Sequence, residues 1–153
     1  MGAANFYHVT HSAVESVVEN LLGRALGQGW RVELRGREAG RMGWFDQKLW
    51  LGRDDGFLPH GLAGGPHDAL QPVLLTTAPV AGEFHALMSI DGAEVSPDET
   101  GARERVWILF DGNDPAAVDH ARGQWRALTG AGVSAQYWSE ESGRWQMKAE
   151  SGG

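Results

Sequence analysis

The stretch RVWILFD, residues 105–111, decides the fold class. Between its charged ends it is an unbroken apolar run, which is typical of a strand buried on both faces of a parallel sheet. After Gly112 comes an Asn-Asp-Pro segment typical of a helix start, and Pro115 at a first helical position predicts a helix over residues 115–129. A buried strand that leads at once into a helix is the repeating unit of an α/β fold.

The same alternation extends on both sides of that stretch. Apolar residues at helical period between residues 12 and 29 predict the most regular helix of the chain, and Ser12 and Glu15 have the spacing of a capping box at its start. We expect a second helix at residues 39–52 and further strands at 5–9, 30–36, 73–77, 85–91 and 133–141. The sequence therefore predicts a three-layer α/β/α protein with a mostly parallel sheet and helices on both faces.

Three segments lack a clear pattern of secondary structure. Residues 52–72 are rich in glycine and proline and are expected to form a long loop, while residues 92–104 are interpreted as a polar connection. Residues 142–153 have a polar end, KAESGG, and are expected to be a flexible tail. We therefore expect a single α/β domain over residues 1–141, followed by this tail.

Composition and charge limit the classes of function. The chain of 153 residues has a net charge of −7, so its overall field repels a polyanion and little direct DNA binding is expected. It contains no cysteine, which excludes disulfides, zinc–thiolate sites and cysteine nucleophiles. The first residues do not have the pattern of a secretion signal, and no apolar run reaches membrane-spanning length. We expect a cytoplasmic protein without a membrane partner.

Sequence signals for catalysis are weak. The glycine-rich segment 61–67 lacks the lysine and the spacing of a phosphate-binding loop, so no nucleotide cofactor is expected. Asp91 and Asp111 each end an apolar strand, where carboxylates can hold Mg²⁺. A magnesium-dependent phosphoryl-transfer enzyme that uses these two residues is the alternative interpretation of the chain. Carboxylates in such positions are also common turn residues.

Large apolar side chains near the glycine-rich loop form a second candidate site. Trp50 ends the helix predicted at residues 39–52, and Phe57, Leu58 and His60 follow in the loop. Large apolar groups in a loop either pin the loop to the core or form an exposed patch that binds another protein. A patch of this kind could also join two copies of this chain. The sequence leaves these alternatives open.

The helix predicted at residues 115–129 carries a basic flank. Arg122 and Arg126 stand four residues apart around Trp125, beside an apolar stripe. They form either a solvated basic face, which the helix dipole favours near a C-terminus, or a peptide site. In a peptide site the guanidinium groups would pair with carboxylates and the indole ring would supply an apolar wall. An acidic peptide with a hydrophobic C-terminal residue would match such a site.

Several segments of the chain together resemble the chi subunit of bacterial DNA polymerase III holoenzyme. They are FYHVTHS, FDQKLWLGRDDGFLPHGLAGGP, QPVLLTT, VWILFDG and ARGQWRALTGAGVSAQYW, which occur in this order over about residues 4–138. The most specific part is the pattern L-W-x6-F-x-P-H-x-L-A-G, which begins at Leu49 and ends at Gly64.

This resemblance implies a Rossmann-like fold, no cofactor and no catalytic activity of the chain's own. Chi proteins are accessory subunits that link the clamp loader to the single-stranded-DNA-binding protein, whose acidic C-terminal peptide they bind, and they pair with the psi subunit. By position, the resemblance places the peptide site on Arg122, Trp125 and Arg126. It places the psi interface on Trp50, Phe57, Leu58 and His60.

Overall fold

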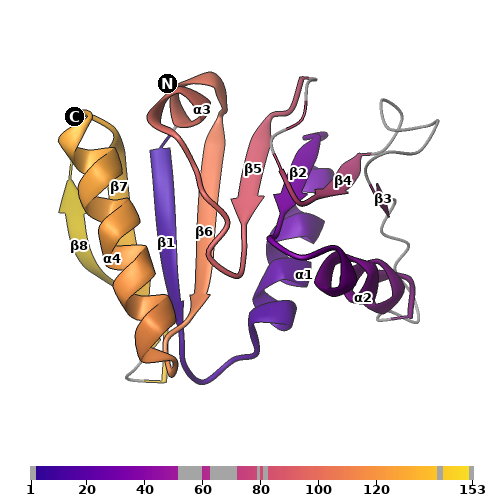
Figure 1. Ribbon diagram of the computed structural model, residues 1–153, viewed down its shortest axis with the longest axis horizontal. Coiled ribbons are helices and arrows are strands. Elements are labelled where there is room, and N and C mark those ends of the chain that lie inside the picture. Colours follow the sequence, from indigo (N-terminus) through magenta and orange to yellow (C-terminus); the bar gives the residue numbers. More distant parts are fainter. Residues whose placement is uncertain are drawn as a thin grey trace.

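The computed structural model describes residues 3–51, 60–62, 72–78, 80, 83–140 and 143–151. Within them the chain forms an eight-stranded sheet of order β3-β4-β2-β5-β6-β1-β7-β8 (Figure 1). Neighbouring strands are parallel throughout except for β7 and β8, which are antiparallel. The strands are β1 (Ala3–Val9), β2 (Val32–Arg35), β3 (His60–Leu62), β4 (Val73–Thr76), β5 (Ala86–Ser89), β6 (Arg105–Asp111), β7 (Ser134–Ser139) and β8 (Gln146–Ser151).

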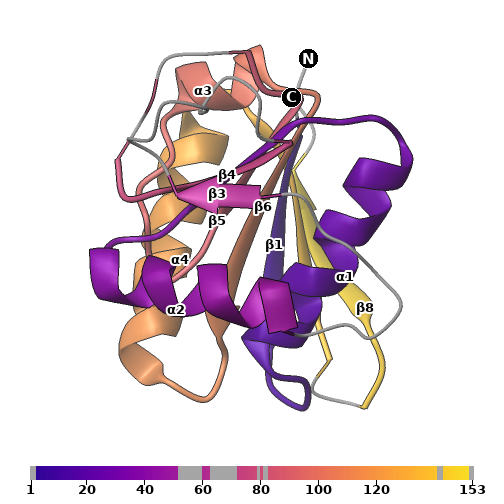
Figure 2. The ribbon, with the colours of Figure 1, turned by 90° about the vertical axis from the view of Figure 1, so that its right-hand side faces the viewer.

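Helices cover both faces of the sheet, which makes the fold the three-layer, Rossmann-like arrangement predicted from the sequence. The helices are α1 (Val14–Gly27), α2 (Ala39–Leu51), α3 (Pro97–Ala102) and α4 (Pro115–Gly130). Seen along the sheet, α1 and α4 lie on opposite sides of it, and α3 lies on the side of α4 (Figure 2). α2 contributes Met42 and Phe45 to the same core cluster as α1.

The central strand β6 is buried on both faces, as its unbroken apolar run predicts. Trp107 and Leu109 belong to the core under α1 and α2, whereas Val106, Ile108 and Phe110 belong to the core under α4. None of these five side chains is more than 5% exposed. Since β6 and β7 both neighbour β1, the chain crosses β1 through α4 on its way from one to the other. This crossing places α4 beside β1 and β7.

Three elements form where the sequence predicts no regular structure. β3 falls in the expected loop 52–72 and α3 in the expected polar connection 92–104. β8 falls in the expected flexible tail 142–153, where residues 146–151 pair with β7. The tail expectation is thereby corrected. The side chains of β8 are exposed, so it has no apolar periodicity, and it forms because the outer edge of β7 offers unpaired backbone groups.

The entry to α1 is fixed by a distant carboxylate and not by the predicted capping box. Glu140 Oε1 accepts hydrogen bonds from the three backbone N–H groups of residues 10–12, at 3.1, 3.0 and 2.6 Å. The hydroxyl of Ser12, expected to cap the helix, donates to Glu140 Oε2 at 2.9 Å. Glu15, its expected partner, instead pairs with Arg41 at 2.9 Å. A carboxylate accepts charge-assisted bonds that are stronger than those to a hydroxyl, so Glu140 ties the start of α1 to the end of β7.

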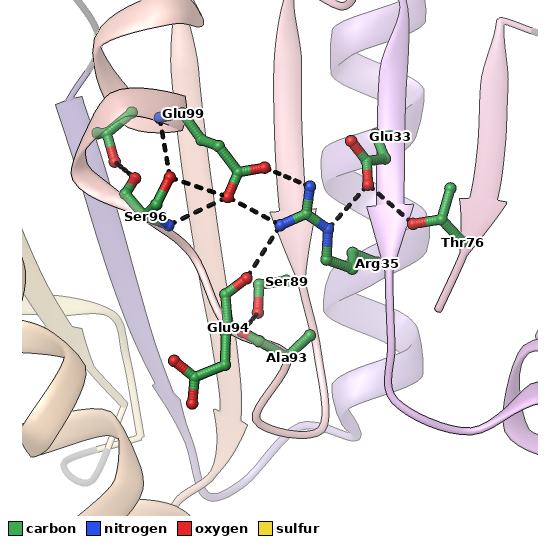
Figure 3. A network of polar contacts seen from close by, with 9 residues as sticks. Glu33, Arg35, Thr76, Ser89, Ala93, Glu94, Ser96 and Glu99 are labelled. Atoms are coloured by element: carbon green, nitrogen blue, oxygen red, sulfur yellow. Dashed lines mark hydrogen bonds and ion pairs between the residues drawn. The ribbon is translucent and has the colours of Figure 1, made fainter. Parts of the chain in front are cut away.

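A buried ion network lies on the face of β2 that points away from α1 and α2 (Figure 3). Arg35 Nε donates to Glu33 Oε2 at 2.8 Å, and its two terminal nitrogens donate to the two carboxylate oxygens of Glu99 at 3.0 and 2.5 Å. The Thr76 hydroxyl on neighbouring β4 donates to Glu33 Oε2 at 2.8 Å. The side chains of Glu33 and Arg35 are only 0% and 3% exposed. One guanidinium therefore joins β2, β4 and the start of α3.

Strand alternation explains why charges occupy this position. Val32 and Leu34 point into the core under α1 and α2, so Glu33 and Arg35 point to the opposite face. Burial opposes the charged guanidinium, but its hydrogen bonds to Glu99 and Glu33 outweigh burial and raise the pKa of Arg35. The fully paired arginine thus remains a cation inside the fold.

α3 begins with a true capping box at Ser96 and Glu99. The Glu99 backbone N–H donates to Ser96 Oγ at 3.2 Å, and the Ser96 backbone N–H donates to Glu99 Oε1 at 3.1 Å. Burial would raise the pKa of Glu99, but the bonds from Arg35 and Ser96 outweigh it and lower the pKa. The same carboxylate therefore caps α3 and binds the buried arginine.

We expect Arg35→Met to destabilise the protein strongly. Removing the guanidinium leaves Glu33 buried without its cation, and breaking a buried ion pair in this way costs about 3–5 kcal/mol. Urea denaturation measures the loss. The matched control is Arg105→Met on β6, where the arginine is exposed and the change should stay within about 0.5 kcal/mol. A loss below about 1 kcal/mol in Arg35→Met would mean that the network behaves like a surface ion pair.

We expect Glu140→Gln to alter the acid sensitivity of the fold. Burial alone would raise the pKa of Glu140, but the bonds from Ser12, Thr10 and His11 outweigh it and lower the pKa. The stability from this carboxylate is therefore fully present above the unfolded value of about 4.3 and is lost as the pH falls through the lower, folded value.

Urea titrations at a series of pH values test this expectation. Glu140→Gln should be about 1–3 kcal/mol less stable than wild type at neutral pH and should lose less of its remaining stability on acidification. The control is Glu104→Gln, at an exposed position on the approach to β6. Parallel pH profiles for wild type and Glu140→Gln would contradict the assignment.

Candidate functional site: a basic cavity beside α4

A cavity of about 490 Å³ lies between α4 and the strands β1, β7 and β8. Its volume falls within the range of ligand pockets, about 300–1,000 Å³. It contains all three residues of the predicted peptide site, Arg122, Trp125 and Arg126. The full lining is His8, Arg122, Trp125, Arg126, Tyr137, Ser139, Lys148 and Ala149. Among the described residues that line it there are three permanent cations and no carboxylate, so the cavity is locally basic in a chain of net charge −7.

An aromatic cluster fixes the floor of the cavity. The Trp125 ring packs edge-to-face on Phe6, with ring centroids 5.3 Å apart, and on Tyr137, with centroids 6.0 Å apart. Trp125 and Tyr137 are partly buried and pack against the core under α4, to which Phe6 belongs. Edge-to-face contacts of this kind stabilise a defined ring orientation. The indole therefore forms a rigid apolar wall.

His8 orients the hydroxyl group of Tyr137. His8 Nδ1 lies 2.8 Å from the Tyr137 hydroxyl oxygen, and Nε2 lies 3.3 Å from the carbonyl oxygen of Gly112. Because a carbonyl only accepts hydrogen bonds, the neutral ring carries its hydrogen on Nε2 and accepts from Tyr137 through Nδ1. A Cβ atom at position 112 would overlap the His8 ring, so this close approach requires a glycine.

The two arginines present unengaged donors to the cavity. Arg122 and Arg126 are exposed, and neither side chain forms a hydrogen bond or ion pair with another residue in the described part of the chain. Among the described residues, the Lys148 ammonium has one long contact, 3.4 Å to Gln146 Oε1. Guanidinium groups in this state can pair bidentately with a carboxylate. The cavity is thus built to accept an anion next to an apolar group.

The carboxylates of the alternative, enzymatic interpretation lie in a different cavity. Asp91 and Asp111 both line a space of about 690 Å³ at the carboxyl ends of β1 and β6. Asp91 Oδ2 accepts a hydrogen bond from Arg41 Nε at 3.0 Å, and Asp111 Oδ1 accepts one from the backbone N–H of Asn113 at 2.9 Å. Each carboxylate is therefore used in an ion pair or a turn. Over the residues that the structure describes, no three His, Asp or Glu side chains gather as metal ligands.

The predicted psi interface falls mostly outside the described residues. Phe57 and Leu58 lie outside them, and only the backbone is described for Trp50, near the end of α2, and for His60, the first residue of β3. β3 pairs with β4 at the edge of the sheet opposite to β8. The psi interface therefore stays a prediction, and the alternative that these side chains pin the loop to the core stays open.

Comparison with known proteins identifies the family. The family model of the DNA polymerase III chi subunit, HolC, matches residues 1–136. The chain belongs to this family. Chi subunits are components of the DNA polymerase III complex, which gives this chain an accessory role in DNA replication. Among the described residues, no helix is long and apolar enough to cross a membrane.

A solved structure shares the fold of this chi-family chain. The C-terminal domain of a possible DNA helicase from Lactobacillus plantarum WCFS1 matches it with a TM-score of 0.52 and 16% sequence identity, over 78% of this chain and 81% of that one. At such low identity the similarity establishes the α/β fold alone. No curated protein sequence matches the chain.

Sequence reasoning missed five residues of the basic cavity. They are His8, Tyr137, Ser139, Lys148 and Ala149. Alternation along the strand predicted at residues 133–141 could have placed Tyr137 and Ser139 on one face, together with buried Ala135. No comparable signal marked Lys148, which lies in the segment predicted to be a flexible tail.

Proposed function

We propose that this chi-family chain is a non-catalytic accessory subunit that binds the acidic C-terminal tail of the single-stranded-DNA-binding protein. One observation carries the proposal. The three residues to which the family resemblance assigns this peptide line a single basic cavity with an aromatic floor, in a chain that is otherwise acidic. Binding would link the DNA-binding protein to the clamp-loader complex in the cytoplasm.

Recognition would combine charge pairing with apolar packing. Arg122 and Arg126 donate to the terminal carboxylate and to adjacent acidic side chains, while the Trp125 ring packs against the hydrophobic terminal residue. The ring is already fixed by Phe6 and Tyr137, so little side-chain entropy is lost when the peptide binds. The single-stranded-DNA-binding protein makes the contact with DNA, because the net charge of this chain disfavours one.

We expect a fluorescent peptide with several aspartates before Ile-Pro-Phe and a free carboxyl end to bind in an anisotropy titration. Arg122→Ala should weaken binding about 10-fold or more, as truncation of an interface anchor does, and amidation of the peptide should also weaken it. Added salt should weaken binding because the arginines are exposed and screening limits their reach to about 8 Å at physiological ionic strength.

The matched control for this titration is Arg105→Ala. Arg105 is also exposed, but it lies at the start of β6 and outside the cavity, so its variant should bind like the wild type. The proposal would be refuted by a wild-type protein that does not bind the peptide, or by equal losses in Arg122→Ala and Arg105→Ala.

The second part of the proposal is pairing with the psi subunit through Trp50, Phe57, Leu58 and His60. It is supported by the family membership and by the family pattern that these residues carry. Trp50 lies near the end of α2 and His60 begins β3, so a psi interface that contains them would lie at the sheet edge opposite to the basic cavity. The two partners could therefore bind at the same time.

We expect Trp50→Ala and Phe57→Ala each to weaken the complex with psi in sedimentation-velocity experiments, because large aromatic side chains anchor protein interfaces. The comparison is Trp44→Ala, an exposed tryptophan earlier on α2 that lies outside the family pattern. Unchanged complex formation by both variants would reject the assignment. Concentration-dependent mass of the chain without psi would favour self-association through the same patch.

A further inference from the structure

A strand beyond the family pattern completes the basic cavity. The family match ends at residue 136, whereas β8 spans residues 146–151. β8 nevertheless supplies Lys148 and Ala149 to the lining, on the opposite side from α4. This wall of the cavity therefore lies outside the residues that the chi family model matches.

A β-bulge directs Lys148 into the cavity. Tyr137 pairs with Ala149 and Trp138 pairs with Met147, which leaves Lys148 as an extra residue between the two pairs. In a regular ladder consecutive residues point to opposite faces, so only one of Lys148 and Ala149 would face α4. Both line the cavity, because the bulge interrupts the alternation. Bulges in other proteins re-aim side chains next to functional sites in the same way.

The contacts of Lys148 give it little role in holding the fold. The side chain is exposed, and its ammonium has only the 3.4 Å contact with Gln146 Oε1 among the described residues. Glu140, which ties the end of β7 to residues 10–12, does not contact it. The cation thus faces a site that already holds Arg122 and Arg126 and has no carboxylate among its described lining residues.

We propose that Lys148 determines specificity in this site by binding an acidic side chain upstream of the tail's terminal residue. This inference rests on the proposed function. The terminal residue packs on Trp125, so its carboxylate lies next to Arg122 and Arg126 on the same helix. Lys148, on the β8 wall of the cavity, then lies beside the peptide segment that precedes the terminal residue. The ligand selected is a peptide with both a free carboxyl end and acidic side chains before it.

A double-mutant cycle between protein and peptide tests this inference. The protein variants are Lys148→Met and Lys148→Arg, and the peptides carry either aspartates or asparagines before Ile-Pro-Phe. Lys148→Met should weaken binding of the aspartate peptide about 3- to 10-fold and leave binding of the asparagine peptide unchanged, while Lys148→Arg should restore the affinity. The matched control is Lys48→Met, which removes the chain's other lysine. Thermal melting checks that each variant folds.

The outcomes separate this inference from the function on which it rests. If the wild type binds and Arg122→Ala does not, but Lys148→Met binds the aspartate peptide like the wild type, the role of Lys148 is refuted and the proposed function stands. Equal weakening of both peptides by Lys148→Met also refutes selection of acidic side chains. If the wild type binds neither peptide, both proposals fail.

Discussion

The fold depends on one constraint, the burial of β6 and β1 on both faces. An apolar strand in the middle of a sheet exposes two surfaces to water unless helices cover both. The connections between strands must therefore place a helix on each face of the sheet. α1 covers one face and α4 the other (Figure 2). Because α4 carries the chain from β6 across β1 to β7, it lies beside β1 and β7. The arginines of α4 consequently stand over a margin of the sheet, where a cavity can open.

The margin at β7 shows how an exposed sheet edge becomes part of a site. The parallel run ends with β7, whose outer backbone groups would otherwise remain unpaired. The chain turns back, with Gly143 at a positive φ of 93°, and adds β8 in the antiparallel direction, which a short connection permits. The exposed side chains of β8 suit an edge that faces water, and the bulge allows both Lys148 and Ala149 to line the cavity. Pairing that completes the sheet thus also shapes the cavity.

Buried polar groups hold connections between elements of the fold. Arg35 fixes the start of α3 on β2 through Glu99, and Glu140 fixes the entry to α1 on the end of β7. Each of these buried groups is stabilised by several hydrogen bonds, which offset the cost of removing a charge from water. Asp91 and Asp111, which lie where a magnesium site could form, are likewise used in an ion pair and a turn. The side chains of Arg122 and Arg126 differ from these groups, because they have no partner among the described residues.

The sequence by itself determined the α/β class and the part of the candidate site that lies on α4. Apolar periodicity records which side chains must be buried, so residues 105–111 were recognisable as a strand covered on both faces. Helical spacing likewise placed Arg122, Trp125 and Arg126 on one side of α4.

Only the tertiary structure decided the features that rest on pairing between distant groups. The spacing of Ser12 suited a local cap, but Glu140, 128 positions away, binds it instead. β8 has no periodicity to recognise, because it is held by the backbone of β7 and not by buried side chains. Whether Lys148 faces α4 depends on the register of that pairing, which no single strand contains. Local sequence patterns indicate which side chains are buried. Hydrogen-bond and strand partners that are distant in the sequence depend on how the fold brings them together.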